Sequence, residues 1–343
     1  MKRLILKKIL PWLITFGALY LAFRGVEWDL LIGHISNAKP LYILVAVALT
    51  VASYWLRALR WPLLFPKVSL PLLSSWKVLV LGFFMNNILP ARAGELVRAH
   101  LGAKVLGVAR TLVLATIASE RLADGLTISL FFVLIVGFIG RGSLDPEISQ
   151  NLLYVAYLFA AVAIGVIAVL LCRDLIIKNL ERVASRIGKS SSSYALSRVQ
   201  IFIDGLSPLS KPKRAVKIAV WSFVIWGVEL VAFAAISKAF GGQIFLSGTV
   251  LFLVAVNFSS LIPAAPGGFG VIELIAKSVL VSAGVATPEL ALSMVLTQHI
   301  IQYAVIGIPG AFLLSTLRTQ LADMSDSARQ EPVPEASISA STS

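Results

Sequence analysis

The amino-acid sequence predicts an all-α polytopic membrane protein, with about six full transmembrane helices and two re-entrant, Pro/Gly-broken helical hairpins. The prediction rests on composition, on the length of the apolar runs and on the charges between them. Of 343 residues, 58% are hydrophobic and 14% are charged, and the mean hydropathy is +0.88. Soluble domains are about 45–50% apolar and about 25% charged, so this chain needs the bilayer as its solvent. A soluble enzyme is therefore excluded.

The full spans are predicted from apolar runs, because a membrane helix needs about 20 mostly apolar residues. The runs are 7–23, 41–61, 111–139, 152–172, 215–239 and 290–317. The first has the basic start of a signal peptide but no small-residue cleavage site, since Tyr20 stands near its end, so we expect an uncleaved span. Two further stretches, 72–105 and 248–283, are interrupted by Pro and Gly and are too broken for two full spans each.

The loop charges predict the topology, because cytoplasmic loops carry an excess of Lys and Arg. Basic residues gather at the N-terminus, in the loop near 57–77, which includes Arg57 and Arg60, in 92–110, and in 173–214, which has nine Lys and Arg against three acids. The loops 24–40, 140–151 and 240–247 carry little net positive charge. The assignment of basic loops to the cytoplasm and of the other loops to the outside is consistent only if both broken stretches are re-entrant. Stretch 72–105 must then enter and return from the cytoplasm, and stretch 248–283 from outside.

The two halves of the chain then have the same element order in opposite orientation, which is an inverted repeat. The repeat is supported by a shared pattern at both breaks, Leu89-Pro90-Ala91-x-x-Gly94 and Ile262-Pro263-Ala264-x-x-Gly267. We expect a first half at 1–140 and a second half at 141–172 and 215–320. A basic cytoplasmic linker, 173–214, joins them, and 321–343 is expected to be a disordered tail.

The first hairpin is a candidate binding site because Pro90 interrupts the helix and leaves unpaired backbone groups at membrane depth. The restarted half-helix presents partial positive charge to an anion. Arginine can engage a phosphate with its planar fork. The candidate residues are Asn86, Asn87, Arg92, Glu95 and Arg98. The alternative is that these arginines are interface anchors paired with Glu95.

In the second hairpin, Gly267, Gly268 and Glu273 are the candidates, since glycine permits close backbone approach. A tight packing turn without a ligand is the alternative. The span that follows carries Gln298, His299 and Gln302, whose spacing matches that of a charged triplet in the first half. A lone membrane histidine is more commonly a hydrogen-bonded core residue than a ligand.

That charged triplet, Glu120, Arg121 and Asp124, lies inside an otherwise apolar stretch. Charges at membrane depth need an interior position and partners. Glu120 and Asp124 share a helix face, whereas Arg121 points elsewhere and should find a different partner. Two interpretations stay open: a structural ion-pair network, or part of a headgroup or proton pathway. Glu229 is a further buried acid candidate.

The sequence predicts no cofactor and no metal site. The histidines, His34, His100 and His299, are scattered, Cys172 is the single cysteine, and phosphate-loop, dinucleotide and hydrolase motifs are absent. The net charge of +13 is explained by loop topology, so we expect no nucleic-acid partner. An enzyme is not expected, because no nucleophile is supplied.

Three motifs in order carry a family resemblance: Asn87-x-x-Pro90-x-Arg92-x-Gly94-Glu95-x-x-Arg98, Glu120-Arg121-x-x-Asp124, and Pro263-x-x-Pro266-Gly267-Gly268-x-Gly270-x-x-Glu273. They resemble the lysylphosphatidylglycerol synthase transmembrane region family, the flippase-like domain of the multiple peptide resistance factor, over residues 5–320. The resemblance implies a multi-pass protein of a bacterial or archaeal inner membrane that translocates lipids. The charge pattern places both termini in the cytoplasm. The chain resembles a stand-alone form, because only the polar segment 321–343 follows the last span.

The resulting function hypothesis is a lipid flippase that moves a phospholipid, or another lipid with a polar headgroup, between leaflets. Its partners would be membrane lipids with an anionic headgroup. The alternative is a non-transporting scaffold subunit for a cytoplasmic lipid- or glycan-modifying enzyme. A second copy of the chain is a further candidate partner.

Overall fold

The computed structural model describes residues 2–66, 70–89, 93–139, 146–187, 189–242, 246–262 and 266–330. Within these ranges the chain is helical and has no strand, which confirms the all-α prediction. The helices are α1 (Lys2–Phe23), α2 (Trp28–Ser36), α3 (Pro40–Arg60), η1 (Trp61–Leu64), α4 (Leu72–Ile88), α5 (Gly94–Leu106), α6 (Arg110–Ile139), α7 (Pro146–Leu171), α8 (Arg173–Ile187), α9 (Lys189–Leu206), η4 (Ser207–Ser210), α10 (Pro212–Ala239), α11 (Leu246–Ser259), η5 (Pro266–Gly268), α12 (Val271–Ser282) and α13 (Pro288–Gln330).

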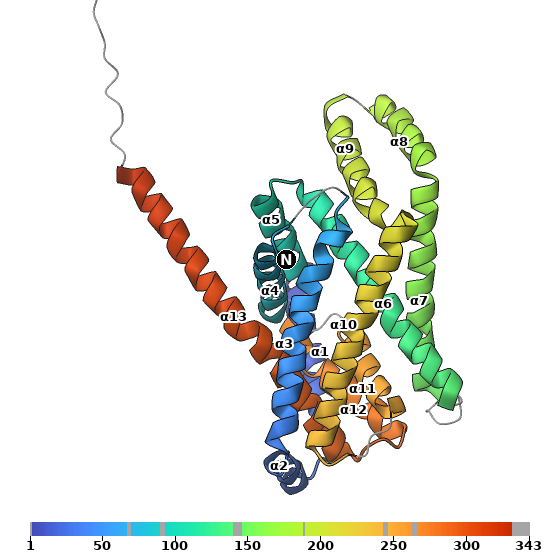
Figure 1. Cartoon of the computed structure of the whole chain (residues 1–343), viewed down its shortest axis with the longest axis vertical. Helices are drawn as coiled ribbons and strands as arrows, with labels where there is room; N and C mark the ends of the chain where they lie inside the picture. The colour runs from blue at the N-terminus through green and yellow to red at the C-terminus, as the bar shows by residue number, and fades with distance from the viewer. Residues whose placement is uncertain are drawn as a thin grey trace, which may run out of the picture.

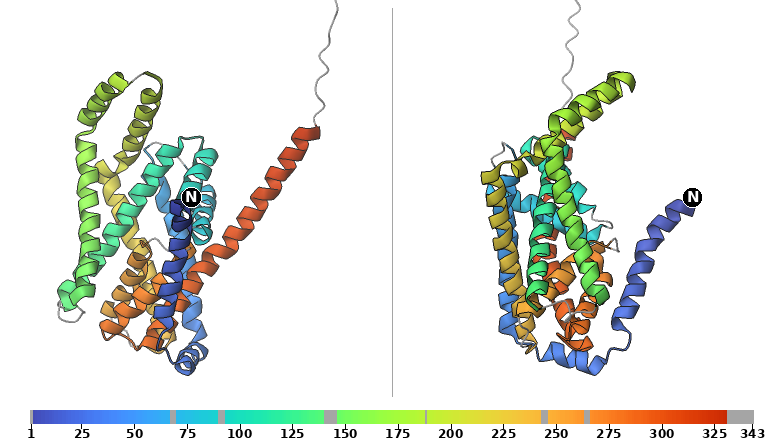
Figure 2. Two further views of the ribbon diagram at one scale, coloured as in Figure 1. Left: turned by 180° about the vertical axis from the view of Figure 1, so that it is seen from behind. Right: turned by 90° about the vertical axis from the view of Figure 1, so that its right-hand side faces the viewer.

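The two broken stretches form two helical hairpins in opposite halves of the bundle (Figure 1). Hairpin α4–α5 lies in the half next to α8 and α9, and hairpin α11–α12 lies in the other half. Their inner ends meet near the middle of the molecule, where η5 packs against α4. Helix α6 packs against both hairpins, α3 packs against α4, and α10 packs against α11. The N-terminal end of α1 and the C-terminal end of α13 slope away from the bundle (Figure 2).

Proline and glycine set the helix boundaries. Pro40, Pro212 and Pro288 each occupy the first residue of a helix, where the missing N–H costs nothing. Leu89 precedes Pro90 and is extended, with φ −95° and ψ 141°, which ends α4. Gly107 ends α5 in the left-handed region at φ 63°, with its N–H donated to the Ala103 carbonyl.

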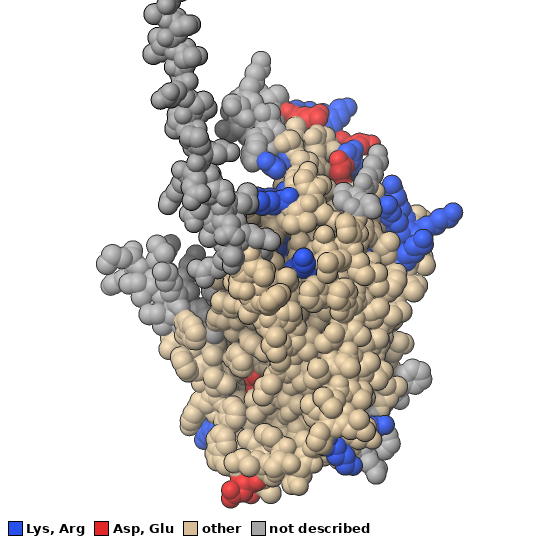
Figure 3. Space-filling model, turned by 60° about the vertical axis from the view of Figure 1, so that its left-hand side comes forward, with Lys and Arg blue, Asp and Glu red and all other residues tan. Residues whose placement is uncertain are grey.

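The surface has the charge distribution of a membrane protein. Among the described residues, three helices are long and apolar enough to cross a bilayer, namely Pro40–Leu64, Pro212–Ala239 and Pro288–Thr316. The other three predicted spans are also helical, in α1, α6 and α7. On the face that Figure 3 shows, Lys, Arg, Asp and Glu gather toward the two ends of the molecule, and the band between them is largely free of exposed charge.

Segments that the sequence places outside the membrane are also helical. The linker 173–214 contains α8 and α9, and α8 turns from α7 by 72°. The sequence predicts a disordered tail from residue 321, but α13 continues through Gln330. Residues 331–343 lie outside the described part of the chain.

The core is centred on α11, which is surrounded by protein. Residues 248–255 of this helix are all buried, and they pack with apolar side chains of α6, α10, α12 and α13. A helix that is apolar on every face is stable only where no face meets water. The second hairpin is therefore built around a buried first arm, which fixes where its tip lies.

Candidate functional site

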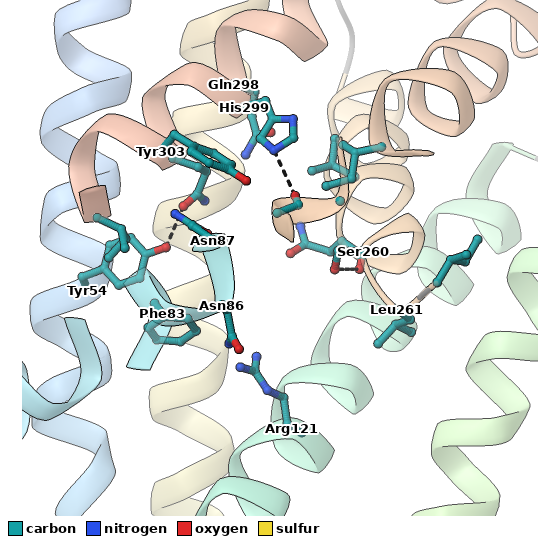
Figure 4. Close-up of a pocket in the computed structure, with 18 of the residues that line it drawn as sticks. Tyr54, Phe83, Asn86, Asn87, Arg121, Ser260, Leu261, Gln298, His299 and Tyr303 are labelled. Carbon is teal, nitrogen blue, oxygen red and sulfur yellow. Dashed lines mark hydrogen bonds between the residues drawn. The ribbon is translucent and has the colours of Figure 1, made fainter. Parts of the chain in front are cut away.

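A cavity of about 350 Å³ lies between the tips of the two hairpins (Figure 4). The tip of a hairpin is the end at which its two helices are joined, α4 to α5 in the first and α11 to α12 in the second. Its wall is formed by the ends of α4 and α11, by the segment that leads into α12, and by α3, α6, α10 and α13. Amides, hydroxyls and aromatic rings line much of it, together with two arginines, Arg57 and Arg121. Irregular backbone at membrane depth is tolerated where it lines such a cavity.

At the first tip, Asn86 and Asn87 line the cavity. Asn86 Oδ1 is buried and has no hydrogen-bond partner, although buried polar atoms normally have one. In Figure 4 the Asn86 amide and the Arg121 guanidinium point toward one another. Gly94 begins α5 where α4 and α5 meet, and a Cβ atom there would lie 2.4 Å from Gly82 O. Arg92 and Pro90 lie outside the described residues.

Asp124 is the centre of a buried ion-pair cluster. Arg60 Nη1 donates to Asp124 Oδ1 at 2.5 Å, and Arg57 Nη1 donates to Oδ2 at 3.2 Å. Trp226 Nε1 donates to Oδ1 at 3.1 Å. Arg57 also pairs with Glu229 at 3.5 Å, so the two arginines balance two carboxylates. Each of these four charged residues is at most 6% exposed, so each charge depends on the others.

This cluster corrects the topological interpretation of Arg57 and Arg60. The sequence treats them as cytoplasmic loop charges, but α3 continues through Arg60 and packs against α10. Both guanidinium groups are buried between helices. The signal that could have placed them is their i, i+3 spacing at the end of an apolar run, which puts both on one helix face.

A second buried pair joins the first hairpin to α6. Arg98 donates to both oxygens of Glu120, at 3.1 and 2.7 Å, and its guanidinium lies 4.6 Å from the centre of the Trp61 ring. Glu120 therefore does not face the cavity. Glu120 and Asp124 have the geometry of the ion-pair network rather than of free cavity groups.

Arg121 points away from that network, as its place on the helix predicts. Its Nε donates to Glu95 Oε1 at 2.7 Å, and the side chain is 31% exposed. Glu95 is thereby paired with an arginine, as the anchor interpretation expects, but with Arg121 rather than with Arg98. Arg121 also lines the cavity, and Glu120 and Asp124 do not.

At the second tip, Glu273 holds the backbone and a histidine together. Its Oε2 accepts the Gly270 N–H at 2.7 Å, and its Oε1 lies 2.5 Å from His299 Nδ1. The other ring nitrogen, Nε2, lies 3.2 Å from the Gly267 carbonyl oxygen. Gly267 has φ 73°, and a Cβ atom there would lie 1.1 Å from the Tyr303 hydroxyl, so glycine is required.

The candidate residues divide into a lining set and a supporting set. The lining set is Asn86, Asn87, Arg121, Gly267, Gly268, Gln298, His299 and Gln302, and the supporting set is Glu95, Arg98, Glu120, Asp124 and Glu273. Lining residues that sequence reasoning did not select include Tyr54, Trp226 and Asn257. The amide of Asn257 at the end of an apolar run could have marked it, whereas nothing in the local sequence separates Tyr54 and Trp226 from ordinary membrane-helix residues. Within the described chain, no group of three His, Cys, Asp or Glu is placed to hold a metal ion.

The hydrogen bond of Tyr54 in the cavity wall can be tested by mutation. Its hydroxyl donates to Gln302 Oε1 at 2.6 Å, which orients the Gln302 amide. We expect Tyr54→Phe to lower the free energy of unfolding by about 0.5–1.5 kcal/mol, the net value of one hydrogen bond. Thermal unfolding of the detergent-solubilised chain measures this. Tyr20→Phe is the control, because Tyr20 is 66% exposed, and an equal loss in both variants would contradict the assignment.

Comparison with known proteins places this architecture in a family. The model of the lysylphosphatidylglycerol synthase TM region matches residues 8–310. The chain belongs to this family. No solved structure matches the chain significantly.

Similar curated proteins are archaeal. Glycosyltransferase AglD of Haloferax volcanii is 25% identical, in an alignment that covers 90% of this chain and 54% of that protein. A UPF0104 membrane protein of Methanothermobacter thermautotrophicus is 26% identical over 80% of this chain and 85% of its own length. A UPF0104 membrane protein of Pyrococcus horikoshii is 21% identical over 91% and 97%. The chain thus spans about half of AglD and most of the UPF0104 proteins.

Proposed function

We propose that this membrane protein is a lipid flippase-like transporter, which moves a lipid with a polar headgroup between the two leaflets. The observation that carries the proposal is the polar cavity between the tips of two hairpins, in the middle of an apolar bundle. A headgroup would enter this cavity while its acyl tails stay in the bilayer. In this proposal the protein acts by transport, and the lipid crosses the membrane with its covalent bonds unchanged.

The proposal includes the topology that the sequence predicts. Six helices, α1, α3, α6, α7, α10 and α13, would cross the membrane, and α4–α5 and α11–α12 would be re-entrant from opposite sides. The two halves would form an inverted repeat, as in many secondary transporters. Lys and Arg gather at the end that holds α8 and α9 (Figure 3), so this end would face the cytoplasm, with both termini. The membrane would be the inner membrane.

The proposed headgroup contacts come from both tips. Arg121 uses Nε for Glu95, so its two terminal nitrogens can turn to an anionic group such as a phosphate. The side chains of Asn86 and Asn87 line the cavity, and amide groups can exchange hydrogen bonds with a headgroup hydroxyl or amine. His299 and Gln298 face the same space from α13. This arrangement suits an anionic headgroup that also carries donors.

We predict that Arg121→Gln slows leaflet exchange of a fluorescent phosphatidylglycerol by about tenfold or more. A charge-assisted hydrogen bond contributes about 1.5–3 kcal/mol, and about 1.4 kcal/mol corresponds to tenfold. The full chain would be reconstituted in vesicles, and a membrane-impermeant reductant would report the outer-leaflet probe. Lys213→Gln removes an exposed charge far from the cavity and is the matched control. A wild-type chain that accelerates exchange of no anionic or zwitterionic probe would contradict the proposal.

The second candidate function is a non-transporting scaffold for a lipid- or glycan-modifying enzyme. It is favoured by one observation, the similarity to a region of a protein named as a glycosyltransferase. The basic α8–α9 hairpin would then be the docking surface on the cytoplasmic side. Co-purification of a cytoplasmic enzyme, together with no leaflet exchange by the chain alone, would favour this function over transport.

A further inference from the structure

We propose that His299 and Glu273 form a proton-binding site that locks the tip of the second hairpin, and that this proton is the coupling ion of transport. The coupling role rests on the proposed function, whereas the proton site itself stands on geometry. His299 is 5% exposed and Glu273 is 0% exposed, so the pair sits within the protein. His299 and Gly267 nevertheless line the cavity, which gives a proton a route to the pair.

The hydrogen-bond geometry requires the pair to hold an extra proton. Nδ1 of His299 faces a carboxylate oxygen at 2.5 Å, and Nε2 faces the Gly267 carbonyl oxygen at 3.2 Å. Both facing atoms are acceptors, so each contact needs a hydrogen between its two atoms. A neutral imidazole supplies only one hydrogen. We place the second hydrogen on the ring, which sets an imidazolium against the Glu273 carboxylate and leaves the pair neutral overall.

Two aromatic rings enclose the imidazole. The Phe269 ring stacks on the imidazole with its centre 4.5 Å away, and the Tyr303 ring meets it edge-on at 5.0 Å. Aromatic faces attract cations, and this attraction is stronger where water is excluded. Tyr303 also donates to the Pro266 carbonyl at 3.5 Å, next to the same turn.

Among the carboxylates that the structure describes around the cavity, Glu273 is the one paired with a histidine. Glu120, Asp124, Glu229 and Glu95 are all paired with arginine. Arginine does not lose its proton in proteins, so these pairs contain no second group that exchanges a proton. Histidine changes charge near neutral pH. A mobile proton therefore belongs at Glu273 rather than at Glu120 or Asp124.

Other titratable groups on the elements packed around the pair do not take over this role. They are Tyr20 on α1, Asp29 and His34 on α2, Tyr54 and Arg57 on α3, Glu229 on α10, Lys277 on α12, Glu289 and Tyr303 on α13, and Arg121 across the cavity on α6. Of these described groups, Tyr303 is the one whose ring contacts His299. Lys277 instead donates to the Ala22 carbonyl at 2.5 Å.

Loss of the proton would release the tip. The remaining ring hydrogen can serve Glu273 or Gly267 but not both, and the second nitrogen would then turn a lone pair toward an oxygen. The turn that it holds has positive φ at Gly267, Gly268 and Gly270, and glycine gives such a segment alternative conformations. Proton binding therefore holds the tip in the observed conformation, and proton release removes one of the contacts that hold it.

The ring state is tested directly by NMR, because the chain has only three histidines. A full chain with His34→Gln and His100→Gln leaves His299 as the single histidine. It would be labelled with 15N-histidine and placed in phosphatidylglycerol and phosphatidylethanolamine vesicles from about pH 5 to about pH 8, where histidine titrates. We expect doubly protonated imidazole at the acidic end and its loss as pH rises. Glu273→Gln should abolish the doubly protonated signal.

The tip is followed in the same samples by hydrogen exchange, corrected for the intrinsic pH dependence of amide exchange. The segment 266–273 should be protected at acidic pH and lose protection as His299 deprotonates. His299→Gln should remove this pH dependence, and Glu289→Gln, which changes a buried acid at the start of α13, should keep it. The inference would be overturned by a His299 ring that stays neutral at every pH. It would also be overturned if the amide protection of 266–273 did not change together with the protonation of the ring.

Leaflet exchange in these vesicles separates the inference from the proposed function. If the protonation of His299 and the amide protection of the tip change together with pH but no lipid exchange occurs, the transport function fails and the proton site stands. If exchange occurs but neither the ring nor the tip responds to pH, the proton site fails and the transport function stands. Exchange that follows an imposed pH gradient in wild type, but not in His299→Gln, supports both.

Discussion

Replacing Asp124 with alanine is expected to lower the free energy of unfolding by about 3–5 kcal/mol, the usual cost of breaking a buried ion pair from one side. Asp124 accepts hydrogen bonds from Arg57, Arg60 and Trp226. Without it, Arg57 keeps Glu229 as a partner, while Arg60 is left with the Ser222 hydroxyl. The loss would appear as a lower yield of monodisperse protein and a lower unfolding temperature in detergent.

The matched control for this prediction is Asp204→Ala. Asp204 also pairs with an arginine, Arg173, but the two side chains are 52% and 41% exposed. Exposed pairs contribute about 0–1 kcal/mol, so this variant should be close to wild type. Similar unfolding temperatures for the two variants would show that the Asp124 cluster is not buried as the structure has it.

Replacing Gly94 with alanine is expected to disrupt the first hairpin. The added Cβ atom would lie 2.4 Å from the backbone nitrogen of Asn86 and 2.4 Å from the carbonyl oxygen of Gly82. Both obstacles are backbone atoms of α4, so no side-chain rotation relieves the contact. Overpacking costs typically about 1–3 kcal/mol, and here we expect the upper end or more. Because Asn86 lines the cavity, leaflet exchange should fall as well.

Gly165→Ala in α7 is the control, since a Cβ atom there meets nothing within 4 Å. Alanine in a helix interior is more favourable than glycine by about 0.5–1 kcal/mol, so this variant should be slightly stabilised. Thermal unfolding of both variants gives the comparison. A Gly94→Ala chain that unfolds at or above the wild-type temperature would contradict the close contact between α4 and α5.

The sequence predicts the helices well because their causes are local. An apolar run must become helical in lipid, since only helices satisfy their own backbone there. In the sequence, Pro90 and Pro263 likewise mark the two breaks without reference to the rest of the chain. Helix geometry also correctly predicts that Arg121 of the charged triplet points away from Glu120 and Asp124 and takes a different partner.

Contacts between helices depend on residues far apart in the sequence. They account for most differences between the predicted site and the site in the structure. Arg57 and Arg60 resemble loop charges because they end an apolar run, and only the approach of α6 and α10 gives them buried partners. Tyr54 and Trp226 are selected as cavity residues only once α3, α10 and α13 are placed together. The end of α13 differs for a simpler reason, since polar residues of the tail extend a helix already formed.

The most direct test of a headgroup site between the hairpins is photo-cross-linking in vesicles. A photoreactive amino acid would replace Asn257 in the cavity wall or Phe223 in the apolar groove of α6, α7 and α10. The lipids would be phosphatidylglycerol labelled in the headgroup or in the acyl chain. We predict adducts at 257 through the headgroup, and adducts at 223 through the chain. No adduct at 257, or capture there through acyl chains alone, would contradict a headgroup in this cavity.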